Sequence, residues 1–341
     1  MHNTRVIQGV EVFSTCPQSV EAEGAAYLQK VRDVARWSEQ HGCTGMLVYA
    51  DNRLVDPWLV AHVIIQHTVR LCPLVAVQPI YMHPSAAATM VSSLGHMYGR
   101  RLYLNMIAGG FKNDLTALND LTPHDKRYDR LVEYTVIIKK LLESSFPVSY
   151  DGAFYKITNL KLSPALSSEL MPGVFVSGSS EAGQAAARAM NATAVHYPRP
   201  SVEYTGEGLD GLKDSGVRVG IIARDCEEDA WEVAHKRFPI DRKGEITREL
   251  ATKISDSLWH RQLSELAEDT KSKKSPYWMV PFETYKTNCP YLVGSYQQVG
   301  DEVSQYIKAG HRKFILDIPP CEEELHHSAM VFELVAKESS L

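Results

Sequence analysis

The chain has 341 residues, a formal net charge of −5 and a pI near 6.2, and these values exclude several classes of protein. Nucleic-acid-binding domains usually carry a clustered basic face, so the charge argues against DNA or RNA as a partner. The sequence contains no apolar run long enough to cross a membrane, and the residues after Met1 lack the apolar stretch of a secretory signal. We therefore expect a soluble, cytoplasmic protein.

The hydrophobic fraction of 44% is ordinary for a globular protein and is sufficient to fill one large core. A barrel of alternating strands and helices needs roughly 250 residues before additions, so this length suits one barrel with an insertion. The six cysteines lie far apart, with no CxxC pair and no histidine at zinc-finger spacing. We therefore predict no metal site.

The first half of the chain alternates short β-type runs with longer amphipathic segments, as in βα units around a parallel sheet. A helix that ends at Gly42 and a helix opened by Asp56 and Pro57 carry recognisable end signals. The strands predicted here are 6–13, 45–49, 74–77 and 102–106, and the helices are about 23–41, from 57, about 84–98 and about 126–143.

The second half continues this pattern after a predicted hairpin at 148–157. Further strands are predicted at 173–177, 192–196, 217–223 and 313–317, with a helix that begins near Glu181. Eight strands suit a closed (β/α)8 TIM barrel, and we expect residues 1–341 to form one such domain. The long stretch before the last strand predicts a helical insertion at 224–311, with a lid-like loop at about 271–288.

Active sites of such barrels lie at the carboxyl ends of the strands, where the loops converge. The residues at those ends are Asp51, Gln78, Asn105, Ala108, Ser177 and His196. Together they predict the mouth of a site, although each residue taken alone is more typical of a cap or a turn.

The strongest local signal is an apolar strand that runs into Ser177, Gly178, Ser179 and Ser180 and then into a helix. Free backbone amides at a helix amino terminus bind anions, so a phosphate group is predicted to bind there. The alternative is a plain helix cap. The sequence leaves both interpretations open.

Three further side chains are candidates. His124 and Tyr128 are four residues apart at the start of a helix, so both can project from one face, as a site pair or as a surface cap. Arg218 places a charge in an apolar strand, so it needs a buried partner or an anion.

Taken in order, several segments resemble the luciferase-like flavin-dependent monooxygenases, nearest the alkanesulfonate monooxygenase subgroup. The resemblance covers about residues 40–235 and 290–335. The segments that carry it are Leu47-Val48-Tyr49-Ala50-Asp51, the run RLYLNMIAGG at 101–110, Pro123-His124-Asp125-Lys126-Arg127-Tyr128, the run VSGSSEAG at 176–183, and Ile222-Ala223-Arg224-Asp225.

This resemblance implies a barrel of the bacterial-luciferase type and reduced FMN as the cofactor. It further implies that a separate flavin reductase supplies the reduced FMN, which reacts with O2 to give a C4a-peroxyflavin. It also implies a homodimer or homotetramer. The irregular composition of the lid-like loop separately predicts that this loop closes over the flavin. Arg218 matches the family's arginine in the seventh strand and, with Asn105, is predicted to be catalytic. The cofactor-binding residues implied are Asp51, Gln78, Asn105 and Ala108 near the ring, His124 and Tyr128 at the ribityl chain or phosphate, and Ser177, Gly178, Ser179 and Ser180 at the phosphate.

The sequence departs from the sulfonate enzymes at substrate positions. Leu54 stands where they have cysteine, Gly220 stands where they have histidine, and Pro319-Pro320-Cys321 replaces their Tyr-Pro-His. We therefore expect a different, unidentified small organic or biosynthetic substrate, such as one presented on a carrier, that undergoes hydroxylation or Baeyer–Villiger oxygen insertion. Two alternatives stay open: a deazaflavin (F420)-dependent hydride-transfer oxidoreductase, and a non-catalytic flavin-binding relative.

Overall fold

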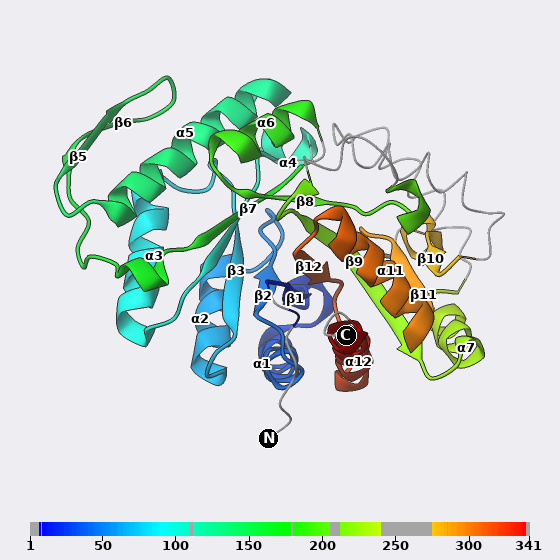
Figure 1. Cartoon of the computed structure of the whole chain (residues 1–341). Coiled ribbons are helices and arrows are strands. Elements are labelled where there is room, and N and C mark those ends of the chain that lie inside the picture. Colours follow the sequence, from blue (N-terminus) through cyan, green and yellow to red (C-terminus); the bar gives the residue numbers. More distant parts are fainter. Residues whose placement is uncertain are drawn as a thin grey trace. The chain divides into compact units, whose positions relative to one another are not determined.

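The computed structural model describes residues 7, 9–109, 112–178, 180–204, 212–239, 275–284 and 286–338 (Figure 1). The strands are β1 Glu11–Thr15, β2 Gly45–Val48, β3 Cys72–Val77, β4 Tyr103–Met106, β5 Val148–Asp151, β6 Lys156–Leu160, β7 Gly173–Ser177, β8 Thr193–His196, β9 Gly216–Arg224, β10 Tyr277–Trp278, β11 Tyr291–Ser295 and β12 Lys313–Leu316. The helices are α1 Gly24–Gln40, α2 Pro57–His67, α3 Pro84–Tyr98, α4 Lys112–Ala117, α5 His124–Glu143, α6 Glu181–Ala189, α7 Glu227–Arg237, α10 Val280–Glu283, α11 Tyr296–Ala309 and α12 Glu322–Glu338.

The chain divides into two compact units, which are described separately. Unit 1 contains Met1–Thr15, Trp37–Thr44 and Val195–Leu341. Unit 2 contains Cys16–Arg36 and Gly45–Ala194.

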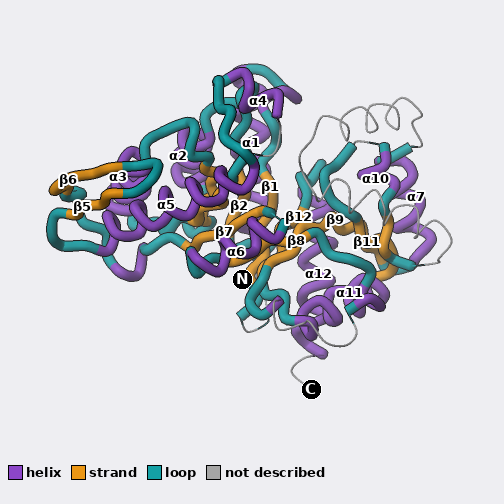
Figure 2. The backbone as a smooth tube through the Cα atoms, turned by 90° about the horizontal axis from the view of Figure 1, so that it is seen from above, coloured by secondary structure: helices purple, strands orange, loops and turns teal. Residues whose placement is uncertain are grey.

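Unit 2 is built on four neighbouring parallel strands in the order β2, β3, β4 and β7. Their residues are almost continuously apolar and buried, as expected when helices cover a parallel sheet. The antiparallel hairpin of β5 and β6 lies beside α3 and α5 in both views (Figures 1 and 2). Because parallel strands end at the same edge, the residues that follow these four strands share one edge of unit 2.

Local signals in the sequence explain where the helices of unit 2 begin and end. The Asp56 carboxylate accepts hydrogen bonds from the backbone amides of Trp58 and Leu59, which caps α2. At the end of α3, Gly99 has a φ of 58°, a left-handed conformation that glycine adopts without a steric penalty. These helix boundaries confirm the ones predicted from sequence.

In unit 1, the long strand β9 holds the sheet together. Its first half pairs in parallel with β8 and β12, and β12 pairs with β1. Its second half pairs in parallel with β11, to which β10 adds an antiparallel edge. The helices α11 and α12 lie side by side and pack on β9 (Figures 1 and 2).

The strand β11 is absent from the sequence prediction, which placed helices and a lid-like loop between 223 and 313. The stretch of Tyr291–Ser295 is short and follows an irregular segment, so its apolar residues gave no clear strand signal. The helix α11 behind it begins with a capping box formed by Ser295 and Gln298. The first strand also differs from its prediction: it covers 11–15 rather than 6–13.

Part of the predicted insertion and of the lid-like loop lies outside the described residues, namely 240–274 and 285. Within the described part of the loop, Tyr277, Met279 and Phe282 are buried in the core of unit 1. The closing of this loop over a flavin therefore stays a prediction. Among the described helices, none combines the length and apolarity that a membrane crossing needs.

Candidate functional site

The side chains predicted from strand ends in unit 2 do lie along one edge. Asp51 follows β2, Gln78 follows β3, Ala108 follows β4, and Ser177 ends β7. Gln78 and Ala108 are buried, whereas Asp51 and Ser177 are half-buried. The edge thus offers polar groups in a largely desolvated setting.

Asn105 and Ser177 are joined directly across the neighbouring strands β4 and β7. The Ser177 hydroxyl donates to Asn105 Oδ1 at 2.9 Å, and Asn105 is only 5% exposed. This bond fixes the rotamer of a buried carboxamide, whose amide nitrogen can donate to a ligand. The sequence identified both residues as site candidates but gave no sign of their contact.

Gly109 explains how the loop after β4 approaches Gln78. Its φ is +99°, and an added Cβ would lie 2.9 Å from Leu115 Cδ2 and 3.2 Å from Gln78 Nε2. A side chain is therefore excluded on both backbone and steric grounds. Because Gly109 has no side chain and Ala108 has only a methyl group, a planar ring can approach the backbone here.

Asp51 lies in an acidic part of the edge. Its Oδ1 accepts from Arg53 N at 2.9 Å and from Arg53 Nε at 3.2 Å. Burial, with added effects of the charges of Asp51 and Asp114, raises the pKa of Tyr81 to about 12. Arg53 partly compensates these two carboxylates, because its guanidinium pairs with Asp51 and opposes the rise that burial causes in the pKa of Asp114.

A second cluster brings together α5, the end of β7 and the start of α6. The rings of His124 and Tyr128 lie edge to face with centroids 5.2 Å apart, and His124 Nδ1 is 2.7 Å from Asp125 Oδ1. Burial raises the pKa of Tyr128, and a hydrogen bond with Ser180 opposes that rise. Tyr128 is therefore a neutral phenol in contact with Ser180.

The glycines of this cluster leave room for Tyr128. A Cβ on Gly178 would lie 2.6 Å from the Tyr128 hydroxyl oxygen, and one on Gly183 would lie 3.2 Å from it. The Ser180 hydroxyl accepts from Gly183 N at 3.1 Å and caps α6. We call Tyr128, Gly178, Ser180 and Gly183 the cradle. It combines hydroxyl groups with a helix amino terminus, the arrangement that suits an anion.

Ser179 lies outside the described residues, and its predicted contact with phosphate stays a prediction. The structure adds Arg127, which sequence analysis left unassigned. Arg127 is 4% exposed, and its charge lowers the pKa of Tyr128, so it places positive potential at the cradle. The only signal in the sequence was its place beside Tyr128.

Arg218 and His196 lie in unit 1. Arg218 Nη2 is 3.6 Å from Asp317 Oδ1, and both side chains are about a tenth exposed. His196 is half-buried, and burial lowers its pKa. Arg218 therefore has the buried partner that its position in the strand requires. Its predicted catalytic role stays a prediction.

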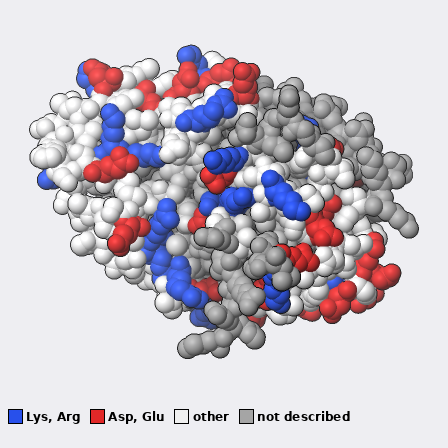
Figure 3. Space-filling model, viewed as in Figure 1, with Lys and Arg blue, Asp and Glu red and all other residues white. Residues whose placement is uncertain are grey.

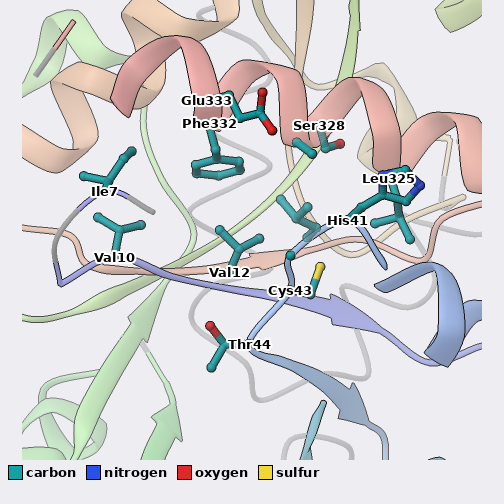
Figure 4. A pocket seen from close by; sticks show the side chains of 13 residues that line it. Ile7, Val10, Val12, His41, Cys43, Thr44, Leu325, Ser328, Phe332 and Glu333 are labelled. Atoms are coloured by element: carbon teal, nitrogen blue, oxygen red, sulfur yellow. The ribbon is translucent and has the colours of Figure 1, made fainter. Parts of the chain in front are cut away.

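A cavity in unit 1 of about 100 Å³ lies between β1 and α12, and none of the predicted site residues lines it (Figure 4). Its walls are mostly apolar, with Val12 and Phe332 facing each other, and Cys43 is among its few polar groups. Burial raises the pKa of Cys43 to about 12, which disfavours its thiolate form. The cavity therefore adds no support to the predicted site residues.

Comparison with known proteins decides the family. A model of the luciferase-like monooxygenase family matches residues 10–313. The chain is also 34% identical over 312 residues to the 4-(γ-L-glutamylamino)butanoyl-[BtrI acyl-carrier protein] monooxygenase BtrO of Niallia circulans, covering 90% of this chain and 91% of that protein. This chain belongs to the luciferase-like monooxygenase family. It is a flavin-dependent monooxygenase, and hence an oxidoreductase.

Solved structures of luciferase-like proteins share the fold. The EDTA monooxygenase EmoA of Chelativorans sp. BNC1 superposes with a TM-score of 0.74 at 13% identity, over 97% of this chain and 94% of EmoA. The 3,6-diketocamphane monooxygenase of Pseudomonas putida, solved with FMN, gives 0.67 at 15% identity over 96% and 97%. An F420-dependent secondary alcohol dehydrogenase gives 0.65 at 14% identity over 96% and 99%. These likenesses confirm the predicted (β/α)8 TIM barrel of the bacterial-luciferase type and show the fold alone.

Proposed function

We propose that this protein is the oxygenase component of a two-component system that uses reduced FMN and O2. The observation that carries the proposal is the cradle. It lies where the luciferase-like pattern of the sequence predicts the binding of the FMN phosphate. The residues fit the cofactor: small residues at 108–109 allow a ring to approach, and hydroxyls with a helix amino terminus suit a phosphate. When bound, reduced FMN supplies the electrons that activate O2.

The residues of the chain have distinct parts in this proposal. Ser180, Tyr128 and the amides at the start of α6 hold the phosphate, with Arg127 adding positive potential. The Asn105 carboxamide, oriented by Ser177, donates to the ring, and Gln78 and Asp51 lie near it. Ser179 is assigned to the phosphate from its place between Gly178 and Ser180.

We further propose that the substrate is an acyl group presented as a thioester on a carrier protein. BtrO, by its name, acts on such a substrate, and the similarity to it extends over nearly the whole chain. One oxygen atom would be added to the acyl chain and the other would leave as water. Hydroxylation and Baeyer–Villiger insertion both meet this balance.

The decisive experiment supplies reduced FMN, O2 and an acyl carrier protein loaded with the 4-(γ-L-glutamylamino)butanoyl group. Oxygen uptake and the intact mass of the acyl carrier are followed together. A mass gain of one oxygen atom that requires reduced FMN supports the proposal. Binding of FMN without any oxygen transfer across a panel of acyl carriers would favour the non-catalytic flavin-binding relative.

The F420 alternative rests on the fold that this chain shares with F420-dependent enzymes. It predicts hydride transfer with no oxygen uptake and tighter binding of F420 than of FMN. Competitive titration of the two cofactors therefore separates the two functions before any substrate is known.

The partners predicted from the sequence belong to the same proposal. A separate flavin reductase would supply reduced FMN, and the chain would assemble as a homodimer or homotetramer. Light scattering of the purified protein measures the second point directly. Among the described residues on the face shown in Figure 3, acidic and basic side chains are interspersed.

A further inference from the structure

Large apolar side chains are exposed on the connections at the carboxyl edge of unit 2. Val55 follows β2 and Tyr81 follows β3. Leu118 and Leu121 follow β4, and Val20 lies in the segment that leads into α1. We call these five residues the rim. Because parallel strands end at one edge, the rim lies beside the predicted site residues of unit 2.

Hydrogen bonds between the connections join the rim into one surface. The backbone amide of Val55 donates to Ser19 Oγ at 3.1 Å, so the segment before α1 contacts the connection after β2. Asn52 Nδ2 donates to Asp114 O at 3.0 Å, and the Tyr81 hydroxyl donates to Asn52 Oδ1 at 2.8 Å. The connections after β2, β3 and β4 are therefore held together.

Charged side chains beside the rim are paired within the chain. The connection from α4 to α5, residues 118–123, has one charged residue, Asp120, which is buried and forms an ion pair with Arg130. Next to β2, Arg53 Nε lies 3.2 Å from Asp51 Oδ1. Apolar side chains that are exposed together, with polar groups at their border, are typical of a protein-binding surface.

The rim also adjoins both parts of the proposed FMN site. Leu121 is three residues before His124, whose ring packs edge to face against Tyr128 of the cradle at 5.2 Å. In the same connection, Leu115 is buried beside Gly109, where a planar ring can approach the backbone. A protein bound to the rim would therefore be placed next to the flavin.

On the basis of the proposed monooxygenase function and its carrier-bound substrate, we propose that the rim is the docking surface for the acyl carrier protein. An acyl group joined to a carrier by a thioester enters the site while the carrier stays outside, so the carrier must contact the surface that borders the site. The rim makes that contact apolar, and covering it with an apolar face of the carrier releases water. The affinity of such a contact depends little on ionic strength.

The test compares two forms of one substrate. The first is the 4-(γ-L-glutamylamino)butanoyl group on the BtrI acyl-carrier protein, and the second is the same group as a thioester of N-acetylcysteamine. Val55→Glu and Leu121→Glu each place a carboxylate on the rim, at side chains that are 44% and 77% exposed and therefore have room for it.

Each variant should weaken binding of the loaded carrier about tenfold or more in isothermal titration, because the new charge loses its water in the complex. The KM for the N-acetylcysteamine thioester and the affinity for FMN should change less than about twofold, because neither ligand needs the rim. Wild-type affinity for the carrier should change less than about twofold between about 0.1 and 0.5 M salt.

Val69→Glu is the matched control. Val69 is also an exposed valine, at 80%, but it lies between α2 and β3, at the edge where the strands of unit 2 begin. This change should leave carrier binding and KM unchanged. Thermal unfolding shows that each variant is folded, and light scattering shows whether its oligomeric state has changed.

Several results would overturn the assignment. They are an absence of carrier binding to the wild type, a steep loss of affinity with salt, wild-type carrier affinity in either folded rim variant, and an equal loss in Val69→Glu. A rim variant that changes the oligomeric state and weakens both forms of the substrate alike would show that the rim joins copies of this chain instead. If Val55→Glu does not fold, Leu121→Glu decides the question.

The proposed function is tested separately in the same samples. Carrier binding is measured without turnover, whereas FMN binding and oxygen transfer to the N-acetylcysteamine thioester are measured without the carrier. Failure of the docking surface therefore leaves the second pair of results intact, and failure of the monooxygenase function leaves the first.

Discussion

Replacing Gly178 with alanine is the sharpest test of the cradle. The new methyl group would lie 2.6 Å from the Tyr128 hydroxyl oxygen and 3.5 Å from its Cζ, so the phenol must move. Tyr128 is packed against His124 and hydrogen bonds with Ser180, so movement breaks both contacts. The change therefore acts on the cradle without removing any polar group.

The expected effect follows from the hydrogen bond that FMN phosphate would lose. A hydrogen bond to a charged group contributes about 1.5–3 kcal/mol. At about 1.4 kcal/mol for each factor of ten, FMN affinity should fall roughly 10- to 100-fold. Quenching of flavin fluorescence during titration measures this change, and thermal unfolding shows that the protein is folded.

Two further variants make the result specific. Gly300→Ala is the control, because a Cβ there has only ordinary contacts at 3.4 and 3.6 Å. It should leave FMN affinity unchanged. In a Tyr128→Phe background the clashing oxygen is gone, so Gly178→Ala should weaken binding by less than twofold further. Unchanged FMN affinity in a folded Gly178→Ala protein would refute the assignment of the cradle to phosphate.

Three other changes have defined outcomes. Replacing Ser179 and Ser180 together with alanine should weaken FMN binding at least tenfold, as measured by titration with FMN. Ser180→Ala alone should lower the free energy of unfolding by about 1 kcal/mol through loss of the α6 cap, as measured by urea unfolding. Although burial of Asp120 opposes it, hydrogen bonds from Arg130 and Thr122 hold the pKa of Asp120 below its usual range. The pair therefore stabilises the fold above the unfolded pKa near 3.9 and loses this effect as pH falls below that value. Asp120→Asn should abolish this part of the pH dependence in urea unfolding, measured between about pH 5 and 2. Burial lowers the pKa of His311 to about 3, below the unfolded value near 6.5. Protonation therefore favours the unfolded state, and the wild-type protein loses stability as pH falls below about 6.5. Between pH 7 and 4 the free energy of unfolding of His311→Asn should fall less than that of the wild type, by about 1 kcal/mol or more, and equal falls would contradict the burial argument.

The local patterns of the sequence determined most of the secondary structure. Helix ends at Pro57, Gly99 and Glu181 depend on cap and turn chemistry within a few residues, and such signals are visible in any sequence. The strands of unit 2 were visible as continuous apolar runs, because helices cover a parallel sheet and its residues are buried. The order of these elements was sufficient to predict the barrel.

The sequence also identified the residues at the strand ends, because a parallel sheet brings those ends to one edge regardless of detailed packing. It could not show that Ser177 donates to Asn105 or that Tyr128 lies against Gly178, because these contacts join residues 72 and 50 positions apart. Side-chain contacts of this kind depend on the relative heights and rotations of neighbouring elements, which no local pattern encodes.

The clearest limit of sequence reasoning is the environment of Arg218. The sequence required a buried partner for this charge but could not name it, because Asp317 is 99 residues away and Tyr291 lies on a strand that the sequence did not reveal. Propensity and patterning thus determined the elements and the edge at which the candidate residues lie. Only tertiary packing decided which charged side chains meet, because Arg218, Tyr291 and Asp317 come from β9, β11 and the end of β12.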